Sequence, residues 1–396
     1  MKKKTIRDID VAGKRVFVRV DFNVPIDKET GAILDDSRIR AALPTIAYLR
    51  GRGAKVILGS HLGRPEGRPD PKLSLAPLAQ RLGELIEATV QTTHCCIGED
   101  VQRTAYSLAA GEVLLLENLR FHEQEESNDA EYAKALASLA EIYINDAFGT
   151  AHRTHASTTG IGMYLPAVAG VLMEKEIEFL SKAAINPEHP YAAIIGGAKV
   201  SSKMAAMGHL MDKVDKLLIG GGMANTFLKA EGFEVGESLV EDDYLDRARD
   251  IMRSAGEKRV KLLLPTDVIV AQLFEADSPA KRVSVRDVPE GWRIVDVGET
   301  TIDVFAHALK GCKTVVWNGP VGVIEMAPFS HGSHRLAAVI ANLEGATTIL
   351  GGGETAVVVD QIGFKDRFSH VSTGGGASLE FMEGKELPGV AALLDA

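Results

Sequence analysis

Short runs of β-branched and other apolar residues alternate with longer stretches rich in Ala, Leu, Glu and Lys along almost the whole chain. Such alternation is typical of βαβ units, in which parallel strands are connected by helices. The pattern predicts one strand in each apolar run. The predicted strands are RVFVRV (15–20), AKVILG (54–59), EVLLLEN (112–118), EIYIND (141–146), YAAIIGG (191–197), KLLIGGG (216–222), VKLLLP (260–265), KTVVWNG (313–319), TTILGGG (347–353) and SHVSTGG (369–375). We therefore expect an α/β protein with mostly parallel sheets.

Residues 167–190, AVAGVLMEKEIEFLSKAAINPEHP, separate the first four predicted strands from the other six. Apolar residues recur in this segment at a partly helical spacing, and the dipeptides Asn186-Pro187 and His189-Pro190 end the pattern. We interpret the segment as one helix that links two α/β lobes, each with a doubly wound, Rossmann-like sheet. An ordinary crossover helix within one large sheet would produce the same pattern.

Length and composition fit the two-lobed interpretation. The 396 residues exceed what one simple core accommodates, and 45% hydrophobic with 25% charged residues is ordinary for a soluble protein. No apolar run approaches the roughly 20 residues of a membrane-spanning helix. The basic N-terminal stretch has no apolar segment after its charges, so it does not resemble a secretory signal, and we expect a cytoplasmic protein.

Charge and cysteine content narrow the function classes further. The formal net charge of −10 argues against a surface that binds nucleic acid or an anionic membrane, although a local basic pocket is compatible with it. The three cysteines, of which Cys95 and Cys96 are adjacent, are too few for a disulfide framework and indicate a reducing compartment.

In the second half of the chain, glycines follow the predicted strands directly. Glycine lets a ligand approach the backbone, and a helix that follows offers free N–H groups to an anion. One such cluster alone is usually only a tight turn, but five on one lobe favour a phosphate-binding edge. The clusters are Gly196-Gly197, Gly220-Gly221-Gly222, Asn318-Gly319-Pro320, Gly351-Gly352-Gly353 and Gly374-Gly375-Gly376.

In the first half of the chain, charged residues occupy the corresponding positions. Arginine forks suit the oxygens of carboxylates and phosphates, so arginines gathered at one sheet edge predict a small polyanionic ligand. Unrelated surface ion pairs are the alternative. The charged segments are Asp21-Phe22-Asn23-Val24-Pro25 with Arg38 beyond it, Ser60-His61-Leu62-Gly63-Arg64-Pro65, Glu117-Asn118-Leu119-Arg120-Phe121-His122 and Ala151-His152-Arg153-Thr154-His155.

Two other kinds of site fit the motifs poorly. His152 and His155 could join other histidines or the adjacent cysteines in a zinc site, but this spacing matches no strong ligand pattern. Gly351-x-Gly353-x-x-Ala356 formally matches the dinucleotide fingerprint, yet it does not lie in the first βα turn of a lobe. The Walker A pattern does not occur in the sequence.

A glycine-rich edge on one lobe and an arginine-rich edge on the other suit phosphoryl transfer. This reaction needs positioning and positive charge around the moving group more than covalent chemistry from the protein. Two lobes that close would also exclude water from a reactive phosphate. In the segment GGAKVSSK, we expect Gly196-Gly197 to end a strand and begin a helix, with Lys199 and Lys203 on one face of that helix.

Eight segments resemble the signature sequences of the phosphoglycerate kinase family and occur in that family's order. They are VRVDFNVP, SHLGRP, ENLRFH, DAFGTAHRTHAST, GGAKVSSK, GGGMA, VVWNGPVGVIE and STGGGASLE. The resemblance implies a two-lobed, hinged monomer that transfers a phosphoryl group between 1,3-bisphosphoglycerate and Mg-ADP, giving 3-phosphoglycerate and ATP. It also implies a phosphoglycerate-binding domain over residues 1–170, on which residues 380–396 pack, and a nucleotide-binding domain over residues 171–379 that includes the linking helix.

The site residues implied by the resemblance fall on the same two edges. Arg38 and Lys203, one from each lobe, would stabilise the transferring phosphoryl group after closure, assisted by N–H groups at Gly353 and Gly376. The residues implied to hold phosphoglycerate are Asp21, Asn23, Arg38, His61, Leu62, Gly63, Arg64, Arg120 and Arg153. The residues implied to hold the nucleotide are Gly196, Gly197, Ala198, Lys199, Lys203, Gly221, Asn318, Pro320 at the adenosine, Glu325 at the ribose, Gly352, Gly353, Glu354 and Thr355.

One position departs from the family's pattern. Glu354 stands in GGGETA where the family most often has aspartate, the carboxylate that helps hold the Mg²⁺ of the nucleotide. Glutamate keeps the charge but adds a methylene group. Because Mg²⁺ demands near-octahedral geometry, the loop or a bridging water must adjust. We expect that Glu354 still serves the metal.

Two other functions suit a two-lobed α/β protein. An NAD-dependent dehydrogenase would need the fingerprint in the first βα turn and an acidic residue about 20 positions further on. A bilobal anion-binding protein also closes on small anions, but such proteins are exported, and the expected lack of a signal sequence counts against this function.

Overall fold

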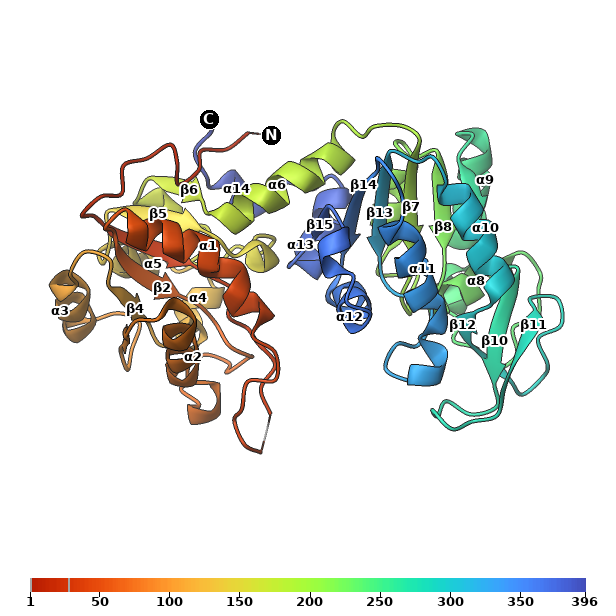
Figure 1. The fold of residues 1–396 in the computed structure, drawn as a ribbon, viewed down its shortest axis with the longest axis horizontal. Helices are drawn as coiled ribbons and strands as arrows, with labels where there is room; N and C mark the ends of the chain where they lie inside the picture. Colours follow the sequence, from red (N-terminus) through yellow and green to blue (C-terminus); the bar gives the residue numbers. More distant parts are fainter. Residues whose placement is uncertain (1, 28) are drawn as a thin grey trace. The chain divides into compact units, whose positions relative to one another are not determined.

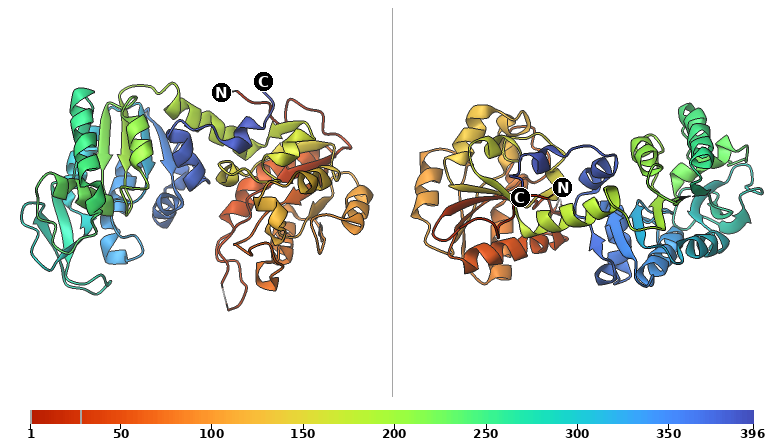
Figure 2. Two further views of the ribbon diagram at one scale, coloured as in Figure 1. Left: turned by 180° about the vertical axis from the view of Figure 1, so that it is seen from behind. Right: turned by 90° about the horizontal axis from the view of Figure 1, so that it is seen from above.

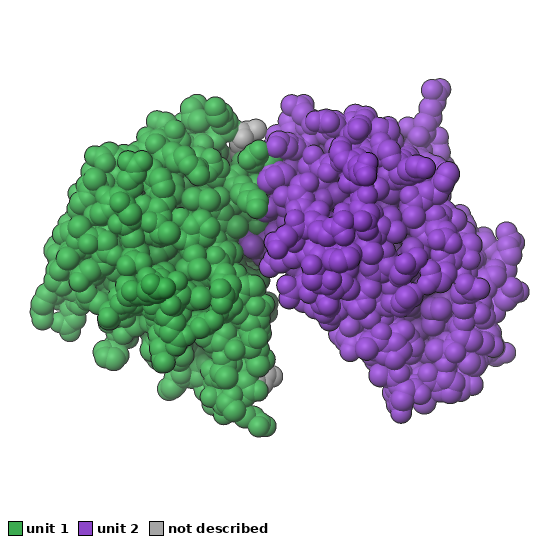
Figure 3. Space-filling view, in the orientation of Figure 1, with its two compact units in different colours: residues 1–178, 386–396 green, residues 179–385 purple. Residues whose placement is uncertain are grey.

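The computed structural model describes residues 2–27 and 29–396, which form two compact units (Figure 3). Unit 1 comprises Met1–Glu178 and Glu386–Ala396, and unit 2 comprises Phe179–Lys385. Helices cover both faces of the large sheet in each unit (Figures 1 and 2). The predicted class, α/β with two doubly wound parallel sheets, is confirmed. The predicted division into a phosphoglycerate-binding domain of residues 1–170 with 380–396 and a nucleotide-binding domain of residues 171–379 stays a prediction.

Unit 1 is built on a six-stranded parallel sheet with the order β3-β4-β2-β1-β5-β6. The strands are β1 (Arg15–Arg19), β2 (Lys55–Gly59), β3 (Val90–Thr92), β4 (Val113–Leu115), β5 (Ile142–Asn145) and β6 (Ala167–Ala169). The helices before the linking segment are α1 (Ser37–Gly51), α2 (Ala76–Ile86), α3 (Glu99–Ser107), α4 (Glu123–Glu126) and α5 (Ala130–Ala137). The strand order reverses between β1 and β5. Open α/β sheets bind ligands beside such a switch point, at the carboxyl ends of the strands.

Burial on both faces explains why the central strands of unit 1 are largely apolar. Val16 and Val18 of β1 pack in one cluster with Ile39 and Ile46 of α1. Phe17, which lies between the two valines, is also fully buried, and its ring lies 6.2 Å from that of Tyr143. Successive side chains of a strand point to opposite faces, so a sheet covered on both sides needs apolar residues at every position.

Unit 2 repeats this architecture with the order β15-β14-β13-β7-β8-β9, again with all strands parallel. The strands are β7 (Tyr191–Ile195), β8 (Lys216–Ile219), β9 (Lys261–Leu263), β13 (Thr314–Asn318), β14 (Thr347–Gly351) and β15 (His370–Val371). The helices are α7 (Met204–Leu210), α8 (Gly222–Ala230), α9 (Leu245–Glu257), α10 (Glu299–Leu309), α11 (His331–Ala341), α12 (Gly353–Gln361) and α13 (Gly375–Met382). The strand order reverses between β7 and β13, which places the switch point at the ends of these two strands.

Trp317 connects the core of unit 2 to the end of β13. Its side chain is fully buried and packs in one cluster with Phe305 of α10 and Leu336 of α11. The indole Nε1–H donates to the carbonyl oxygen of Gly319 at 2.7 Å. The same side chain therefore fills the core and fixes the backbone where the strand ends.

A small antiparallel sheet in unit 2 is absent from the predicted strands. It has the order β11-β10-β12, with β10 (Asp267–Ala271), β11 (Ala280–Ser284) and β12 (Arg293–Val297). Val268 and Val270 pack against Leu228 of α8 in a separate small core. Strands β11 (AKRVS) and β12 (RIVDV) carry charged residues and therefore show no apolar run. Strand β10 is apolar from Val268 to Ala271 but was also not predicted.

The linking segment contains one helix. Helix α6 is Val171–Ala184, and the boundary between the units falls within it. Ala167–Ala169, at the start of the segment, form β6 and pair with β5. This strand was not among those predicted, because only its pairing with β5 distinguishes it.

Asp146, which directly follows β5, fixes where α6 begins. Its Oδ1 accepts hydrogen bonds from the backbone N–H groups of Leu172, at 2.9 Å, and Met173, at 3.2 Å. The carboxyl group thereby satisfies two N–H groups that have no acceptor within the helix. Burial raises the pKa of Asp146 to about 7, although these bonds and the Thr45 hydroxyl oppose the rise.

The C-terminal segment, with α14 (Pro388–Ala391), lies in unit 1. Gly389 N–H donates to the carbonyl oxygen of Ala151 at 2.8 Å, and Asn145 Nδ2 donates to the carbonyl oxygen of Gly389 at 3.1 Å. These bonds place the segment beside the end of β5. Among the residues that the structure describes, no helix is both long enough and apolar enough to cross a membrane.

Candidate functional site

The switch point of unit 2 brings two backbone segments into direct contact. Gly196 N–H donates to the carbonyl oxygen of Asn318 at 2.9 Å, and Gly197 N–H donates to that of Pro320 at 2.8 Å. A Cβ on Gly196 would lie 2.2 Å from the carbonyl oxygen of Pro320, and one on Gly319 would lie 2.4 Å from that of Gly196. Only glycine allows this approach, which occurs where open α/β sheets bind their ligands.

Two helix N-termini adjoin the same edge. Helix α12 begins at Gly353 and α13 at Gly375. A Cβ on Gly375 would lie 3.1 Å from Cα of Gly352 and 3.3 Å from N of Gly353, so the two first turns are in contact. The first N–H groups of a helix have no intrahelical acceptor and carry partial positive charge. Gly353 and Gly376, both exposed in these turns, are therefore placed where an anion would be stabilised.

Thr355 ties α12 to the end of β13. Its side chain is fully buried, and its Oγ1 accepts a hydrogen bond from Gly319 N–H at 2.8 Å. The hydroxyl thus holds the Gly319 turn in place.

Lys203 and Asn318 form a polar pair beside these turns. Lys203 Nζ donates to Asn318 Oδ1. Burial lowers the pKa of Lys203, and the negative charges of Glu354 and Glu383 oppose this change. Asn318 Nδ2 is buried and has no hydrogen-bond partner among the described residues. An ammonium group and an unsatisfied amide donor side by side suit a ligand with several acceptor oxygens.

The predicted helical relation between Lys199 and Lys203 is wrong. Helix α7 begins only at Met204, and turns fill the segment after Gly197. Glu241 stabilises these turns, because its carboxylate accepts bonds from the Ser201 hydroxyl, at 2.6 Å, and from the Ser201 N–H, at 2.9 Å. A side-chain acceptor for Ser201 competes with helix formation at this point. Ala198 and Lys199 are consequently exposed, whereas Lys203 is half-buried.

A cavity of about 350 Å³ opens beside the glycine turns of unit 2. Its walls come from these turns, from the small antiparallel sheet and from the segment after β13. Predicted site residues among its lining are Gly197, Ala198, Gly221, Pro320, Glu325 and Glu354. The lining also includes apolar residues that no sequence motif indicated, namely Leu239, Val268, Phe274, Ile294, Val295 and Val297. A largely apolar cavity with a few polar groups suits a flat heterocycle.

Glu354 offers a carboxylate at the edge of this cavity. It is exposed in the first turn of α12 and lies close enough to Lys203 to influence the pKa of that lysine. Within residues 2–27 and 29–396 there is no group of three or more His, Cys, Asp or Glu side chains that could hold a metal ion. Mg²⁺ is usually bound by one or two carboxylates together with phosphate oxygens. Glu354 therefore fits an ion that arrives with a nucleotide.

In unit 1, the predicted substrate residues form a connected set at the switch-point edge. Arg38, in the first turn of α1, makes an ion pair with Asp21. Asp21 Oδ1 accepts from the N–H of Asn23 at 3.3 Å, and Asn23 Oδ1 accepts from the N–H of Gly63 at 2.9 Å. These contacts connect α1 to the loop after β2.

Arg120 is a buried cation with an unused donor. Its side chain is only 3% exposed, Nη1 donates to the carbonyl oxygen of Gly63 at 2.8 Å, and Nε lies 3.1 Å from Glu126 Oε1. Burial lowers the pKa of Arg120 to about 10, with Arg153 and Arg19 acting in the same direction. Nη2 is buried without a hydrogen-bond partner among the described residues. Such a donor favours an anionic acceptor.

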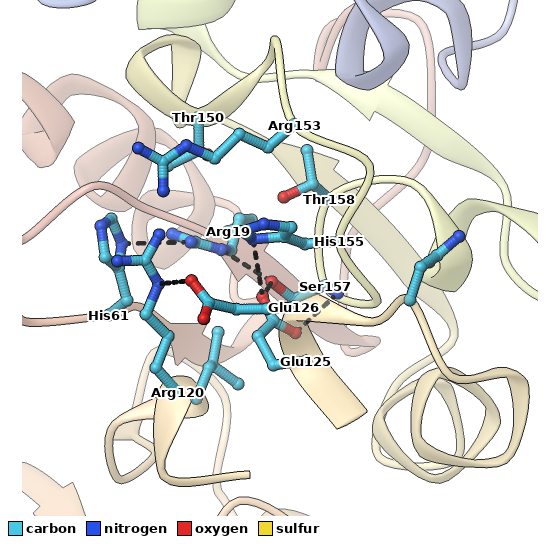
Figure 4. Close-up of polar contacts among 12 residues, drawn as sticks. Arg19, His61, Arg120, Glu125, Glu126, Thr150, Arg153, His155, Ser157 and Thr158 are labelled. Atoms are coloured by element: carbon cyan, nitrogen blue, oxygen red, sulfur yellow. Dashed lines mark hydrogen bonds and ion pairs between the residues drawn. The ribbon is translucent and has the colours of Figure 1, made fainter. Parts of the chain in front are cut away.

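Two neutral histidines lie among these arginines (Figure 4). Burial, followed by the positive charges of Arg19, Arg120 and Arg153, lowers the pKa of His155 to about 3. The same causes hold the pKa of His61 well below its ordinary value. At neutral pH the positive potential therefore comes from the arginines, and the imidazoles act as uncharged hydrogen-bonding groups. This environment suits a small polyanion.

The remaining predicted residues complete the edge of unit 1. Arg64 is exposed, and Nε of Arg153 lies 3.4 Å from Nε2 of His152. Leu62 is buried, and its N–H donates to Asn118 Oδ1 at 3.3 Å. Asn118 also accepts from the N–H of Arg120, at 3.1 Å, and thus connects the loop after β2 to the segment after β4.

Three buried polar residues of this region were not selected from the sequence. Arg19, Glu125 and Ser157 are all 0% exposed, and Ser157 contacts both of the others (Figure 4). A single arginine among the β-branched residues of RVFVRV was a signal for Arg19. Glu125 and Ser157 gave no comparable signal, because they meet Arg19 only after folding.

Comparison with known proteins finds relatives over the whole chain. A family model described as phosphoglycerate kinase matches residues 6–385. A phosphoglycerate kinase from Moorella thermoacetica is 54% identical over 395 residues, with 100% of both chains covered. Among solved structures, phosphoglycerate kinase from Coxiella burnetii has 41% identity and a TM-score of 0.88, with 98% of both chains covered. The corresponding protein from Pyrococcus horikoshii has 31% identity and a TM-score of 0.86 at the same coverage.

Proposed function

The chain belongs to the phosphoglycerate kinase family, and we propose how the residues of its two units carry out the reaction of that family. The protein is a phosphotransferase that moves a phosphoryl group reversibly between 1,3-bisphosphoglycerate and ADP, giving 3-phosphoglycerate and ATP. The family match gives no support to an NAD-dependent dehydrogenase or a bilobal anion-binding protein.

We assign phosphoglycerate binding to the edge of unit 1. The observation that carries this assignment is the buried Arg120, whose Nη2 lacks a partner among the described residues, close to the neutral His61. The carboxylate and phosphate oxygens of phosphoglycerate would accept from Arg120, Arg153 and His61. Asn23 and Arg38 would contact the substrate from the other side of the edge, and the exposed Arg64 would reach it from the rim.

We assign nucleotide binding to the edge and cavity of unit 2. The apolar cavity would hold the adenine ring, with Pro320 in its wall and Glu325 accepting from the ribose hydroxyls. The phosphates would lie at the Gly196-Gly197 turn and the N-termini of α12 and α13. Lys203 and the unsatisfied Nδ2 of Asn318 would donate to phosphate oxygens.

We further propose that Glu354 helps to hold Mg²⁺ together with the nucleotide phosphates. The ion, when bound, neutralises phosphate charge and orients the transferring group. Glu354 would contribute its carboxylate from the first turn of α12, on the same side of the cavity as the glycine turns.

Transfer itself requires charge stabilisation rather than a general base, because the acyl phosphate has a good leaving group. We propose that Arg38 and Lys203 donate to the moving phosphoryl group, with N–H groups at Gly353 and Gly376 as neutral donors. Because these residues come from different units, the units would close by a hinge at the linking helix α6, which also excludes water.

A coupled assay with 3-phosphoglycerate and Mg-ATP tests this proposal. We expect ATP consumption that depends on 3-phosphoglycerate, and a fall in kcat of about 100-fold or more in Arg38→Ala. Arg40→Ala is the matched control, since Arg40 lies on the same helix but is exposed and pairs with Asp36 at 2.8 Å. Equal activity of the Arg38→Ala and Arg40→Ala variants would contradict the role of Arg38.

We also propose that the protein acts as a cytoplasmic monomer without nucleic-acid partners. The formal net charge of −10 opposes binding to nucleic acid, and each predicted substrate site uses residues of one chain only. Sedimentation of the purified protein with and without substrates checks the monomer, because a dimer mass would contradict it.

A further inference from the structure

Arg19 occupies an unusual position for a charged residue. It ends β1 at the switch point of unit 1, and its side chain is 0% exposed. The guanidinium group donates through Nε to Ser157 Oγ at 2.8 Å and through Nη1 to the carbonyl oxygen of Val20. Nη2 lies 3.2 Å from Nδ1 of His61 (Figure 4). A buried cation is held only where its donors are used, and here three of its nitrogens contact acceptors.

The contact with His61 decides where the imidazole proton lies. An arginine guanidinium has donors only, so Nδ1 of His61 must accept this hydrogen bond. In a neutral imidazole, one nitrogen accepts and the other carries the proton. The ring of His61 is neutral because burial and the surrounding arginines lower its pKa well below the ordinary value. Its proton therefore lies on Nε2.

Glu125 and Ser157 keep Arg19 in this orientation. The Ser157 hydroxyl donates to Glu125 Oε1, and the Ser157 N–H donates to Oε2 at 3.0 Å. The hydroxyl proton is thereby committed to Glu125, so Ser157 Oγ presents a lone pair to Nε of Arg19. Burial raises the pKa of Glu125, and the positive charge of Arg19 is the first effect that opposes the rise. The buried carboxylate and the buried guanidinium thus compensate each other through Ser157.

We propose that Arg19 is a positioning residue that fixes His61 as the tautomer with its proton on Nε2, so that His61 offers a hydrogen-bond donor to an oxygen of phosphoglycerate. The opposite tautomer would direct a lone pair at the anion and repel it. This inference rests on the proposed function in one respect, namely that His61 contacts phosphoglycerate. The tautomer itself is a property of the protein without substrate.

The first experiment measures the tautomer directly. Two-bond ¹H–¹⁵N correlation spectra of ¹⁵N-histidine-labelled protein, recorded near neutral pH without substrate, distinguish the two neutral tautomers and the imidazolium ion. The His61 signals are assigned by their loss in His61→Gln. We expect a protonated Nε2 and an unprotonated Nδ1. A proton on Nδ1, a mixture of tautomers or an imidazolium ion would overturn the inference, whatever the enzymatic activity proves to be.

The second experiment tests the role of Arg19 in Arg19→Met and Arg19→Lys. In Arg19→Met we expect a mixture of tautomers and a rise of about tenfold or more in KM for 3-phosphoglycerate, with KM for ATP changed less than about twofold. Arg19→Lys keeps a cationic donor, so it should recover much of the Nε2–H tautomer and of the lost affinity. Retention of the pure Nε2–H tautomer in Arg19→Met would show that Arg19 does not fix it.

Arg15→Met is the matched control for these variants. Arg15 lies on the same strand, but its side chain is 27% exposed and its Nη2 lies 3.5 Å from Glu141 Oε2, away from His61. We expect it to leave the His61 signals and the KM for 3-phosphoglycerate unchanged. If Arg19→Met does not fold, the spectrum of the wild-type protein and the Arg19→Lys comparison still decide the question. The wild-type spectrum could show the expected Nε2–H tautomer while His61→Gln leaves the KM for 3-phosphoglycerate unchanged. That result would contradict the proposed contact of His61 with the substrate and leave the tautomer assignment standing.

Discussion

Gly196 and Pro320 are packed so closely that a Cβ on Gly196 would lie 2.2 Å from the carbonyl oxygen of Pro320. The contact joins the ends of β7 and β13 at the switch point of unit 2. It also determines where the turn that we assign to the nucleotide phosphates can run. A side chain at position 196 must push β13 away or displace the turn.

Gly196→Ala should therefore destabilise unit 2 and weaken nucleotide binding. We expect a loss of about 1–3 kcal/mol in the free energy of unfolding, the usual cost of overpacking, together with a raised KM for ATP. Gly208→Ala is the control, because nothing lies within 4 Å of its added Cβ and the position is helical. That variant should be neutral or slightly stabilising. Equal stability of the two variants in denaturant titrations would contradict the close contact.

Lys203 and Lys199 should differ strongly when each is replaced. Lys203 is half-buried against Asn318, whereas Lys199 is exposed. We expect Lys203→Met to lower kcat by about 100-fold or more, because a donor to the developing charge is lost. Lys199→Met should mainly raise KM for ATP, by less than about tenfold. Steady-state kinetics with varied ATP separates the two effects, and similar kcat losses in both variants would exclude the distinction.

Glu354→Gln should change the response of the enzyme to Mg²⁺. Removing the charge leaves one fewer anionic ligand for the ion, so half-maximal activity should need a higher Mg²⁺ concentration. Titrations of activity with Mg²⁺ at fixed ATP measure this shift. Glu325→Gln is the control, since Glu325 also lines the cavity but is assigned to the ribose. An unchanged Mg²⁺ dependence in Glu354→Gln would show that the metal assignment is wrong.

Asp146 should make the stability of the protein depend on pH. Its pKa is raised from 3.8 to about 7 in the folded protein, so the folded state binds more protons than the unfolded chain between these values. The stability that this group contributes is complete below about pH 4 and is lost as the pH rises through about 7. Asp146→Asn, which keeps an acceptor for Leu172 and Met173, should remove this loss, roughly 2–4 kcal/mol across the interval.

Denaturant unfolding of the wild-type protein and of Asp146→Asn at several pH values measures this pH-dependent loss of stability. Asp100→Asn is the control, because Asp100 is exposed in the first turn of α3. The free energy of unfolding of Asp100→Asn should follow that of the wild-type protein at every pH. If the free energies of unfolding of the wild-type protein and Asp146→Asn differ by the same amount at every pH between about 4 and 7, Asp146 has an ordinary pKa.

Much of the fold could be predicted from the sequence because the two large sheets are covered on both faces. The central strands then need largely apolar runs, and such runs are visible without any knowledge of partners. The edge strand β3 (Val90–Thr92) is only partly buried, has no such run and was not predicted. Glycine clusters predicted the edge of unit 2 to which we assign the nucleotide, for a similar local reason. The close contact of Gly196 with Pro320 leaves no room for a side chain, so position 196 must be glycine and the sequence shows it directly.

The failures have the opposite cause, since they depend on partners distant in sequence. Ala167–Ala169 became a strand because β5 was available, and the helix expected at Lys199 was replaced by turns that Glu241 stabilises. In the antiparallel sheet that walls the cavity, β11 and β12 carry charged residues, so these two strands become recognisable only when they are paired with β10.

The sequence by itself determined the α/β class, the two sheets and the residue types at the two edges to which we assign the substrates, because burial and backbone geometry act locally on the chain. Tertiary structure alone decided how those residues are charged and oriented. Arg19, His61 and Glu125 are far apart in sequence, and only their common burial makes His61 neutral and gives Nδ1 its donor. Desolvation and hydrogen-bond direction depend on every neighbour at once, and folding supplies those neighbours.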